Sequence, residues 1–550
     1  MANTHQPLLD TPKKRSTSFK LLYAVLSLAT IICAIAIVSL ATFKTSQTTS
    51  LKAHLCTHAQ HDQSSCLAVV SEVSSPSDGL MQSSTDADIL QMILAKSSSQ
   101  IQETIELTNK INQRVNDQKS QAALADCLEL MEMSVDRLMD SMVALGSQNL
   151  QSHFSDAHSW LSSVLTNHFT CVDGLDGQAK TIMEPMMKEL IARARTSLAI
   201  LVAIAPTKEE IMLQKLNENL PSWITSKDRR LLESLPKDIK ANSVVAKDGS
   251  GNYKTVQDAV NAAPNNTQTR YVIYVKAGTY QEKVDIGTSK KNLMLVGDGM
   301  NITIITGSLN VVDGSTTFNS ATLAAVGDGF IAQDLCFQNT AGPQKHQAVA
   351  LRLGADKSVI NRCKIDAYQD TLYAHSLRQF YRDSYITGTV DFIFGDAAVV
   401  LQKCQLVARK PMTGQQNMVT AQGRTDPNSI TGTSIQNCDI IASSDLAPVK
   451  GSIKTYLGRP WQAYSRTVVM ESNIGDHIDP AGWSVWDGDL YLKTLYYGEY
   501  QNAGPGAGTR GRVKWARVIS TADATKFTVA QFIQGGQWLK DTGVTYTEGL

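Results

Sequence analysis

Two successive stretches of the chain, VINRCKIDAYQD (residues 359–370) and FYRDSYITGTVD (residues 380–391), share one order of side chains. Each starts with hydrophobic residues, continues through polar residues to a small Cys or Ser, and ends on Asp. Their first residues, Val359 and Phe380, lie 21 positions apart. A repeat of this length, built from short strand-like runs, predicts that each unit forms one turn of a stacked solenoid.

The same order of residues returns three more times, in VLQKCQLVA (400–408), TSIQNCDIIAS (433–443) and VVMESNIGD (468–476). The second hydrophobic position of the unit recurs with spacings of 21, 20, 34 and 34, at Ile365, Ile386, Leu406, Ile440 and Ile474. Short strands with loops of unequal length predict an all-β domain over residues 241–550, a right-handed parallel β-helix. Equivalent residues of adjacent coils then lie about 4.8 Å apart, and the longer loops favour a binding cleft on one face.

Four polar residues follow nearly the same period. Gln347, Gln369 and Asp391 follow one another at intervals of 22 residues, and Asp370 precedes Asp391 by 21 residues. If one coil takes about this much of the chain, all four side chains project from neighbouring coils and form one cluster. An Asp in a solenoid turn often only caps backbone N–H groups, but that role does not explain two Asp and two Gln residues in register.

Such a cluster is suited to acid–base or nucleophilic chemistry. Two close carboxylates cannot both ionise easily, so one keeps its proton near working pH. Glutamine amides can stabilise a developing oxyanion. Arg459, in YLGRPW (456–461), can pair with one Asp, and Trp461 offers a flat face to a sugar ring. These considerations leave open which Asp attacks a substrate.

The N-terminal part of the chain predicts a membrane segment. Residues 21–43 carry no charge, and roughly 20 such residues suffice to span a bilayer. Basic residues precede the segment, which predicts a cytosolic tail over residues 1–20 and a transmembrane signal-anchor over 21–43. A cleaved signal peptide is the alternative. The basic residues are Lys13, Lys14, Arg15 and Lys20.

Residues 85–205 are rich in Leu, Met, Ala, Gln and Glu, with hydrophobic residues at steps of three and four. This periodicity predicts several antiparallel helices and therefore an all-α four-helix bundle. Residues 206–240 contain three prolines and predict a linker. The dibasic pair Arg229–Arg230 in this linker is either a processing site or only solvated charge.

Net charge and cysteine content restrict the class of protein. The chain has 51 basic and 51 acidic residues, which argues against a nucleic-acid partner. Eight of its nine cysteines fall four and four into the two regions, which indicates disulfides in an oxidising compartment. Spacing does not fix the pairs, and neighbour pairing is the simplest proposal. Asn265 and Asn301 match the short N-glycosylation pattern.

No metal site is expected. His54, His58 and His61 lie near Cys56 and Cys66, and we interpret them as histidines beside a disulfide hairpin. His346 and His375, close to the predicted cluster, are interpreted as loop histidines.

Five segments of the second region resemble plant pectin methylesterases, which remove methyl groups from cell-wall pectin. The resemblance covers about residues 241–550, and it implies a right-handed parallel β-helix that uses no metal or cofactor. The segments are GTYQE (278–282), QAVALR (347–352), YQDTLY (368–373), DFIFG (391–395) and LGRPW (457–461).

The resemblance also implies catalytic roles. Asp391 is expected to be the nucleophile that attacks the C6 carboxymethyl carbonyl of a galacturonate unit. Asp370 is expected to protonate the departing methanol and then to activate water. Gln347 and Gln369 are expected to stabilise the oxyanion, and Arg459 to hold Asp391.

Further residues receive expected roles in the same way. Trp461, Tyr368 and Phe392 are expected to line the substrate subsites. The resemblance implies the disulfides Cys336–Cys363 and Cys404–Cys438.

Residues 50–205 resemble the pectin methylesterase and invertase inhibitor family through cysteine spacing and helical pattern. The disulfides expected there are Cys56–Cys66 and Cys127–Cys171. RRLL (229–232) matches the processing motif of such precursors, which implies a serine protease as partner. The precursor is then expected in the secretory pathway, at the Golgi membrane, and the processed enzyme in the cell wall.

Two other classes of function remain as alternatives. In one, the helical region is the active part, as an inhibitor, and the β-helix only binds pectin. In the other, the β-helix is a lyase or a glycosidase. A lyase typically needs clustered acids that bind Ca²⁺, and an inverting glycosidase needs carboxylates about 6.5–9.5 Å apart.

Overall fold

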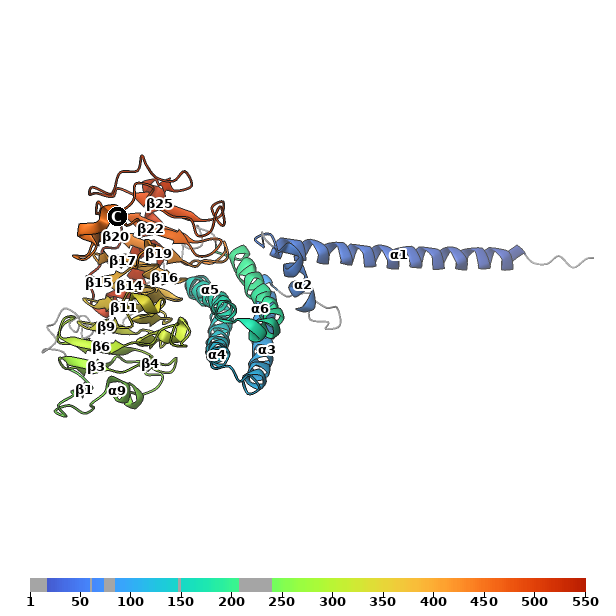
Figure 1. Cartoon of the computed structure of the whole chain (residues 1–550). Helices are drawn as coiled ribbons and strands as arrows, with labels where there is room; N and C mark the ends of the chain where they lie inside the picture. The colour runs from blue at the N-terminus through green and yellow to red at the C-terminus, as the bar shows by residue number, and fades with distance from the viewer. Residues whose placement is uncertain (1–16, 60–61, 74–84, 147–149, 207–239) are drawn as a thin grey trace, which may run out of the picture.

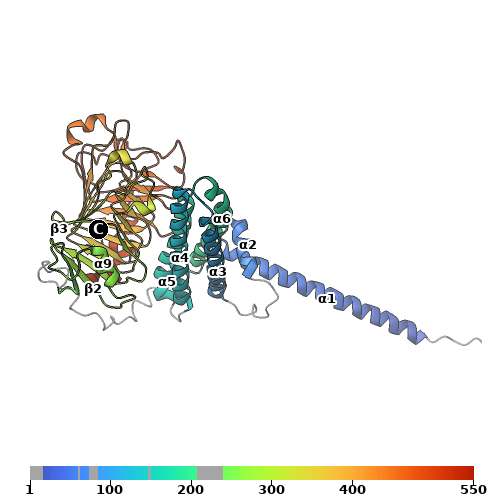
Figure 2. The same ribbon diagram turned by 60° about the horizontal axis from the view of Figure 1, so that its bottom comes forward.

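The computed structural model describes residues 17–59, 62–73, 85–146, 150–206 and 240–550. The predicted processing site at Arg229–Arg230 and most of the predicted cytosolic tail lie outside these residues. Figure 1 shows a stack of β coils with a group of helices packed along one side, and Figure 2 shows the same arrangement after rotation.

The C-terminal region is a parallel β-helix made of three sheets, in which every strand pair between named strands is parallel. The first sheet has 11 strands: β1 (Ser243–Val245), β2 (Tyr271–Val275), β5 (Leu293–Gly297), β8 (Ile331–Gln333), β11 (Ser358–Asn361), β14 (Arg378–Arg382), β17 (Ala398–Gln402), β20 (Gly432–Gln436), β23 (Arg466–Met470), β25 (Tyr496–Tyr500) and β26 (Arg517–Val518). The second has eight: β3 (Gly278–Gln281), β6 (Thr303–Gly307), β9 (Cys336–Asn339), β12 (Lys364–Asp366), β15 (Tyr385–Gly388), β18 (Gln405–Ala408), β21 (Asp439–Ala442) and β24 (Asn473–Ile474).

The third sheet carries the predicted site residues in its strands or close to their ends. It has seven strands: β4 (Val284–Ile286), β7 (Leu323–Ala325), β10 (Leu351–Leu353), β13 (Leu372–Ala374), β16 (Ile393–Gly395), β19 (Asn417–Gln422) and β22 (Thr455–Pro460). Three short helices flank the coils: α9 (Val256–Ala262), α10 (Thr521–Thr525) and α11 (Val529–Phe532).

The register of the second sheet confirms the repeat predicted from the sequence. Ile365 pairs with Ile386, Ile386 with Leu406, Leu406 with Ile440, and Ile440 with Ile474. All five side chains are fully buried inside the coils. One hydrophobic residue from each coil therefore stacks on the next, and this ladder forms the interior core.

The N-terminal region is helical. Helices α3 (Asp86–Asn112), α4 (Gln118–Gly146), α5 (Leu150–Gly174) and α6 (Gly177–Ala203) pack into the predicted bundle, preceded by α1 (Thr17–Leu55) and α2 (Gln63–Val73). The predicted disulfides Cys56–Cys66 and Cys127–Cys171 are present, and the second joins α4 to α5.

The structure does not support the predicted transmembrane anchor at residues 21–43. Among the described residues, no helix combines the length and the apolar character needed to cross a membrane.

The other two predicted disulfides are not formed, since Cys336, Cys363, Cys404 and Cys438 are buried free thiols. Cys336 pairs with Lys364, the residue after Cys363, so the two thiols point to opposite faces of adjacent strands. Cys404 and Cys438 both lie in the interior core, where the Cys404 N–H donates to the Cys438 sulfur at 3.3 Å. Burial raises the pKa of Cys438 well above its usual range, which keeps this thiol protonated.

Candidate active site

Asp370 and Asp391 lie side by side on adjacent coils. Each stands just before a strand of the third sheet, and the first residues of these strands, Leu372 and Ile393, pair with each other. The Asp370 N–H also donates to the carbonyl of Val390 at 3.1 Å, which ties the two turns together. Both Asp residues have positive φ angles, of 60° and 50°, a conformation that Asp tolerates better than most residues. Their exposed fractions are only 7% and 6%.

Arg459 of β22 holds one of the two carboxylates. Its Nε donates to Asp391 Oδ1 at 2.8 Å and its Nη2 donates to Asp391 Oδ2 at 2.6 Å. Such a bidentate pair is stronger and more directional than a single hydrogen bond. The guanidinium also lies over the ring of Trp486, 4.3 Å from its centroid. This double support fixes the orientation of Asp391 and favours its ionised form.

The two carboxyl groups have different electrostatic surroundings. Burial raises the pKa of Asp370 well above its usual range, the nearby charge of Asp391 raises it further, and Arg459 opposes both. Burial also raises the pKa of Asp391, but there the hydrogen bonds and charge of Arg459 act directly against the rise. Asp370 is therefore the member of the pair that keeps a proton, and Asp391 the member that ionises.

Gln347 and Gln369 lie next to the pair. They face each other across a parallel β-bridge, as their spacing in the sequence predicts. Gln369 directly precedes Asp370, and its Oε1 is buried without a hydrogen-bond partner among the described residues. The two amides are thus placed on adjacent coils, beside the two acids.

A strip of aromatic rings runs along the third sheet from this cluster. Tyr373 of β13 stacks on Phe394 of β16 with centroids 4.1 Å apart. Trp461 lies 5.9 Å from Phe394 at one end, and Phe318 lies 6.4 Å from Tyr373 at the other. Flat apolar faces next to polar groups are suited to a carbohydrate chain. Trp461 therefore lies at one end of the strip, and its role in a substrate subsite stays a prediction.

The prediction for Phe392 is wrong. Its side chain is fully buried in the interior core and does not face the strip. Phe394, two positions further on, takes the outward position, because Asp391 interrupts the strand alternation with its positive φ angle. Tyr368 is half-buried and its hydroxyl accepts a hydrogen bond from Arg409 Nη2 at 2.7 Å.

Helix α5 lies over the aromatic strip. Its Thr170 Oγ1 is 3.0 Å from His375 Nε2, and its Thr166 Oγ1 donates to Asp396 at 2.7 Å. The cavity that remains between α5 and the strip has a volume of about 10 Å³, which is at most enough for one water. The helical region therefore fills the space above the strip. His375 is fully buried, and burial lowers its pKa to about 3.

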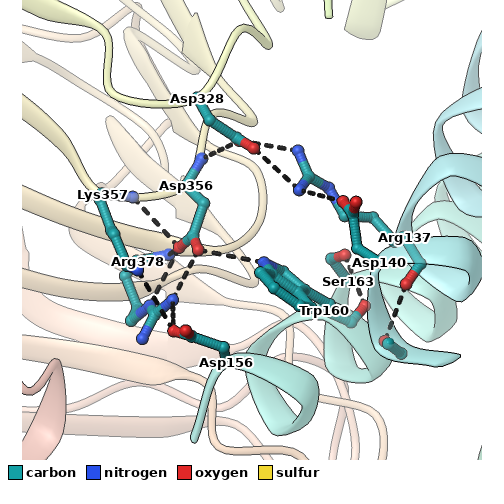
Figure 3. A network of polar contacts seen from close by, with 10 residues as sticks. Arg137, Asp140, Asp156, Trp160, Ser163, Asp328, Asp356, Lys357 and Arg378 are labelled. Carbon is teal, nitrogen blue, oxygen red and sulfur yellow. Dashed lines mark hydrogen bonds and ion pairs between the residues drawn. The ribbon is translucent and has the colours of Figure 1, made fainter. Parts of the chain in front are cut away.

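Beside this contact, charged pairs bind the helical region to the β-helix, as Figure 3 shows. Arg137 of α4 donates to both carboxylate oxygens of Asp328, at 2.9 and 2.7 Å. Arg378 of the β-helix donates to Asp356 and, at 2.5 Å, to Asp156 of α5. Arg137 and Arg378 are both almost completely buried. Buried charges are costly unless they are paired, and here part of the pairing crosses the contact between the two regions.

Sequence reasoning missed Arg352, Tyr373, Phe394 and Trp486. The first three lie in one register of the third sheet, since Arg352 pairs with Tyr373 and Tyr373 with Phe394. They follow one another at intervals of 21 residues, the same spacing as the repeat in the sequence. The same period that found the two Asp residues could thus have found this row.

Two family models match the chain. The model described as pectinesterase matches residues 242–536, and the model described as plant invertase/pectin methylesterase inhibitor matches residues 50–205. Both matches agree with the two structural regions, the β-helix and the helical bundle.

Curated proteins of plants match over the whole chain. Pectinesterase/pectinesterase inhibitor 18 of Arabidopsis thaliana is 55% identical over 565 residues, and pectinesterase 2.1 of Solanum lycopersicum is 56% identical over 563 residues, each with 100% of both chains covered. Among solved structures, pectin methylesterase from carrot is 62% identical with a TM-score of 0.56, and it covers 57% of this chain and 99% of its own. The chain therefore belongs to the pectinesterase family, and its N-terminal region belongs to the plant invertase/pectin methylesterase inhibitor family.

Proposed function

We propose that the β-helix hydrolyses the C6 methyl esters of homogalacturonan, the acidic backbone of pectin, and releases methanol and free carboxylates. The observation that carries the proposal is the carboxyl pair: Asp391, held by Arg459 at 2.8 and 2.6 Å, beside Asp370, whose pKa is raised. An ionised nucleophile and a protonated acid on adjacent coils are what ester cleavage requires.

In the first half of the reaction, an Asp391 oxygen attacks the carbonyl carbon of the ester. The carbonyl oxygen becomes an oxyanion, which the side-chain amides of Gln347 and Gln369 stabilise by donating hydrogen bonds. The intermediate collapses with cleavage of the bond to the methoxy oxygen. Asp370 gives its proton to this oxygen, so methanol leaves and an acyl-enzyme on Asp391 remains.

In the second half, Asp370 is a carboxylate and takes a proton from water. The oxygen of this water attacks the acyl carbon, and the bond to Asp391 breaks. The products are a galacturonic acid carboxyl group, which loses its remaining proton to solvent, ionised Asp391 and protonated Asp370. The two Asp residues are then in their starting state. Arg459 keeps Asp391 oriented through both steps.

The processed enzyme, from which the helical region has been removed, is the form to test. A specific protease site inserted into the 206–240 linker allows the complete chain to fold before it is cut and separated. Highly methylated pectin should then yield equal amounts of methanol and new carboxyl groups. Methanol without new carboxyl groups, or neither product, would contradict ester hydrolysis.

The pH dependence of kcat, which reports the enzyme–substrate complex, follows from the two required protonation states. Activity should fall at low pH as Asp391 takes up a proton, and at high pH as Asp370 loses one. Burial raises the pKa of both groups, and a bound pectin chain would replace the helical region as the cover. We therefore expect the acidic and the basic limb of the pH profile both to have midpoints above the ordinary aspartate pKa of about 3.9.

Arg459→Gln tests the assignment of the acidic limb. The substitution removes the charge that opposes the raised pKa of Asp391, so the acidic limb should move to higher pH. Arg362→Gln is the matched control, because Arg362 makes the same bidentate pair with Asp334 away from the site. An acidic limb that stays in place in Arg459→Gln would show that another group controls it.

We further propose that the helical region inhibits the β-helix until it is removed. The filled space under α5 and the buried charge pairs at Arg137 and Arg378 support this role. Removal would take place at Arg229–Arg230 by a serine protease of the secretory pathway, with the precursor in the Golgi and the processed enzyme in the cell wall. The helical region has two disulfides, which agree with an oxidising compartment. The exposed Asn265 and Asn301 remain predicted glycosylation sites.

A further inference from the structure

Arg352 is a buried cation whose bonding capacity is mostly unused. It lies in the middle of β10, one coil from Tyr373, and only 2% of the residue is exposed. Its one hydrogen bond joins Nη2 to Glu129 of α4 at 3.3 Å, while Nε and Nη1 have no partner among the described residues. Buried guanidinium groups are usually well paired. The free N–H groups of Arg352 could therefore bind a ligand, and in the uncut chain Glu129 takes up only one of them.

The surroundings of Arg352 favour a carboxylate as that ligand. Its guanidinium carbon lies over the ring of Phe318, 3.5 Å from the centroid. Stacking fixes the plane of the group and leaves the N–H edge free for a planar anion. Lys283 lines the same groove, which has a volume of about 550 Å³. On the β-helix side, Lys283 is already paired with Asp285 at 3.1 Å. Arg352 is therefore the cation of this groove that is left for an incoming anion.

The helical region presents carboxylates to this groove. Glu129, Glu132 and Asp136 of α4 line it opposite Lys283 and Arg352. They recur at steps of three and four residues, so they follow one side of the helix. With a helix rise of about 1.5 Å per residue, these carboxylates are spaced about 5 Å apart along α4. They form a row of negative charges, as the free carboxylates of a demethylated uronate chain do.

We propose that Arg352 binds a free carboxylate of the pectin chain, and that Glu129 occupies this position in the unprocessed protein. The inference rests on the proposed esterase function and adds a specificity to it. Arg352 is two coils from Asp391, or about 10 Å along the axis at about 4.8 Å per coil, with Tyr373 and Phe394 between them. One chain can therefore place an ester at Asp391 and an earlier reaction product at Arg352.

The test compares kcat/KM of the processed enzyme on two oligogalacturonates of equal length, one fully methylated and one partly demethylated. The native protein should prefer the partly demethylated substrate. Arg352→Gln should reduce this preference roughly tenfold to hundredfold, as expected for the loss of a charged hydrogen bond, through KM rather than kcat. Arg352→Lys should retain part of the preference because the charge remains.

Lys526→Gln is the control for a lost positive charge, since Lys526 pairs with Asp523 on the surface far along the chain. It should leave the preference unchanged. A preference that is equal in the native protein and in well-folded Arg352→Gln would overturn the inference. If no methanol forms from either substrate, the esterase proposal fails instead. Calorimetric binding of fully demethylated oligogalacturonate then still decides on Arg352, because equal affinity for the native and Arg352→Gln proteins would exclude a carboxylate site.

Discussion

Asp391→Asn should lower methanol release by the processed enzyme at least about 10³-fold, because an amide is a far weaker nucleophile than a carboxylate. Asp370→Asn should have an effect of similar size, since the amide can neither protonate the methoxy oxygen nor activate water. Initial rates on highly methylated pectin measure both effects. The affinity for pectin should change far less than kcat.

Asp334→Asn provides a closely matched control for Asp391→Asn. Asp334 also has a positive φ angle, of 57°, and Arg362 also holds it through two hydrogen bonds, at 2.8 and 2.7 Å. It lies between the first and second sheets, away from the third. Asp334→Asn should therefore stay active, although it should lose about as much thermal stability as Asp391→Asn. Near-native activity in Asp391→Asn would remove this residue from the reaction.

The uncut chain should become more active when the charged contact between its regions is broken. Arg137→Gln removes the buried bidentate pair with Asp328. Breaking such a pair typically costs about 2–5 kcal/mol, which lowers the ratio of closed to open form roughly 30-fold or more. We expect methanol release by the uncut chain to rise accordingly, and release by the processed enzyme to stay the same.

Asp328→Asn breaks the same contact from the β-helix side, so it separates loss of docking from damage to the helical bundle. Lys119→Gln is the control, because the pair of Lys119 with Asp176 lies on the surface of the helical region. An uncut chain as active as the processed enzyme before any substitution would contradict the inhibitory role. So would an uncut chain whose activity does not change in both Arg137→Gln and Asp328→Asn.

The sequence was sufficient to predict the coils because each coil repeats one inward hydrophobic position. Ile365, Ile386 and Leu406 pair in the predicted order, since a shift by one residue would turn every side chain to the wrong face. The same period brought Asp370 and Asp391 together. Regular stacking thus converts spacing along the chain directly into distance in space.

Residues that depend on local breaks in this regularity could not be predicted in the same way. Phe392 was expected in the cleft, but the positive φ angle of Asp391 turns it into the core and leaves Phe394 outside. Cys336 and Cys363 are neighbours in the fold, yet strand alternation points their side chains apart. Such details depend on single backbone angles, which a pattern of residue types does not specify.

Contacts between the two regions also could not be predicted from the sequence. Arg137 and Asp328 are far apart along the chain and bond across the two regions, and nothing in their surroundings marks them as partners. The unused N–H groups of Arg352 are likewise visible only after the groove opposite α4 has formed. Tertiary packing decides these features, because it determines which charges are removed from water.

The most direct test of the central claim is methanol release from highly methylated pectin by the processed enzyme, with and without a metal chelator. The absorbance of unsaturated uronates is recorded in the same samples. The paired carboxyls Asp370 and Asp391, with Arg459, predict methanol release that survives the chelator and produces no unsaturated ends. Unsaturated products that disappear with the chelator would indicate a metal-dependent lyase, and a folded enzyme that releases no methanol would indicate a pectin-binding protein.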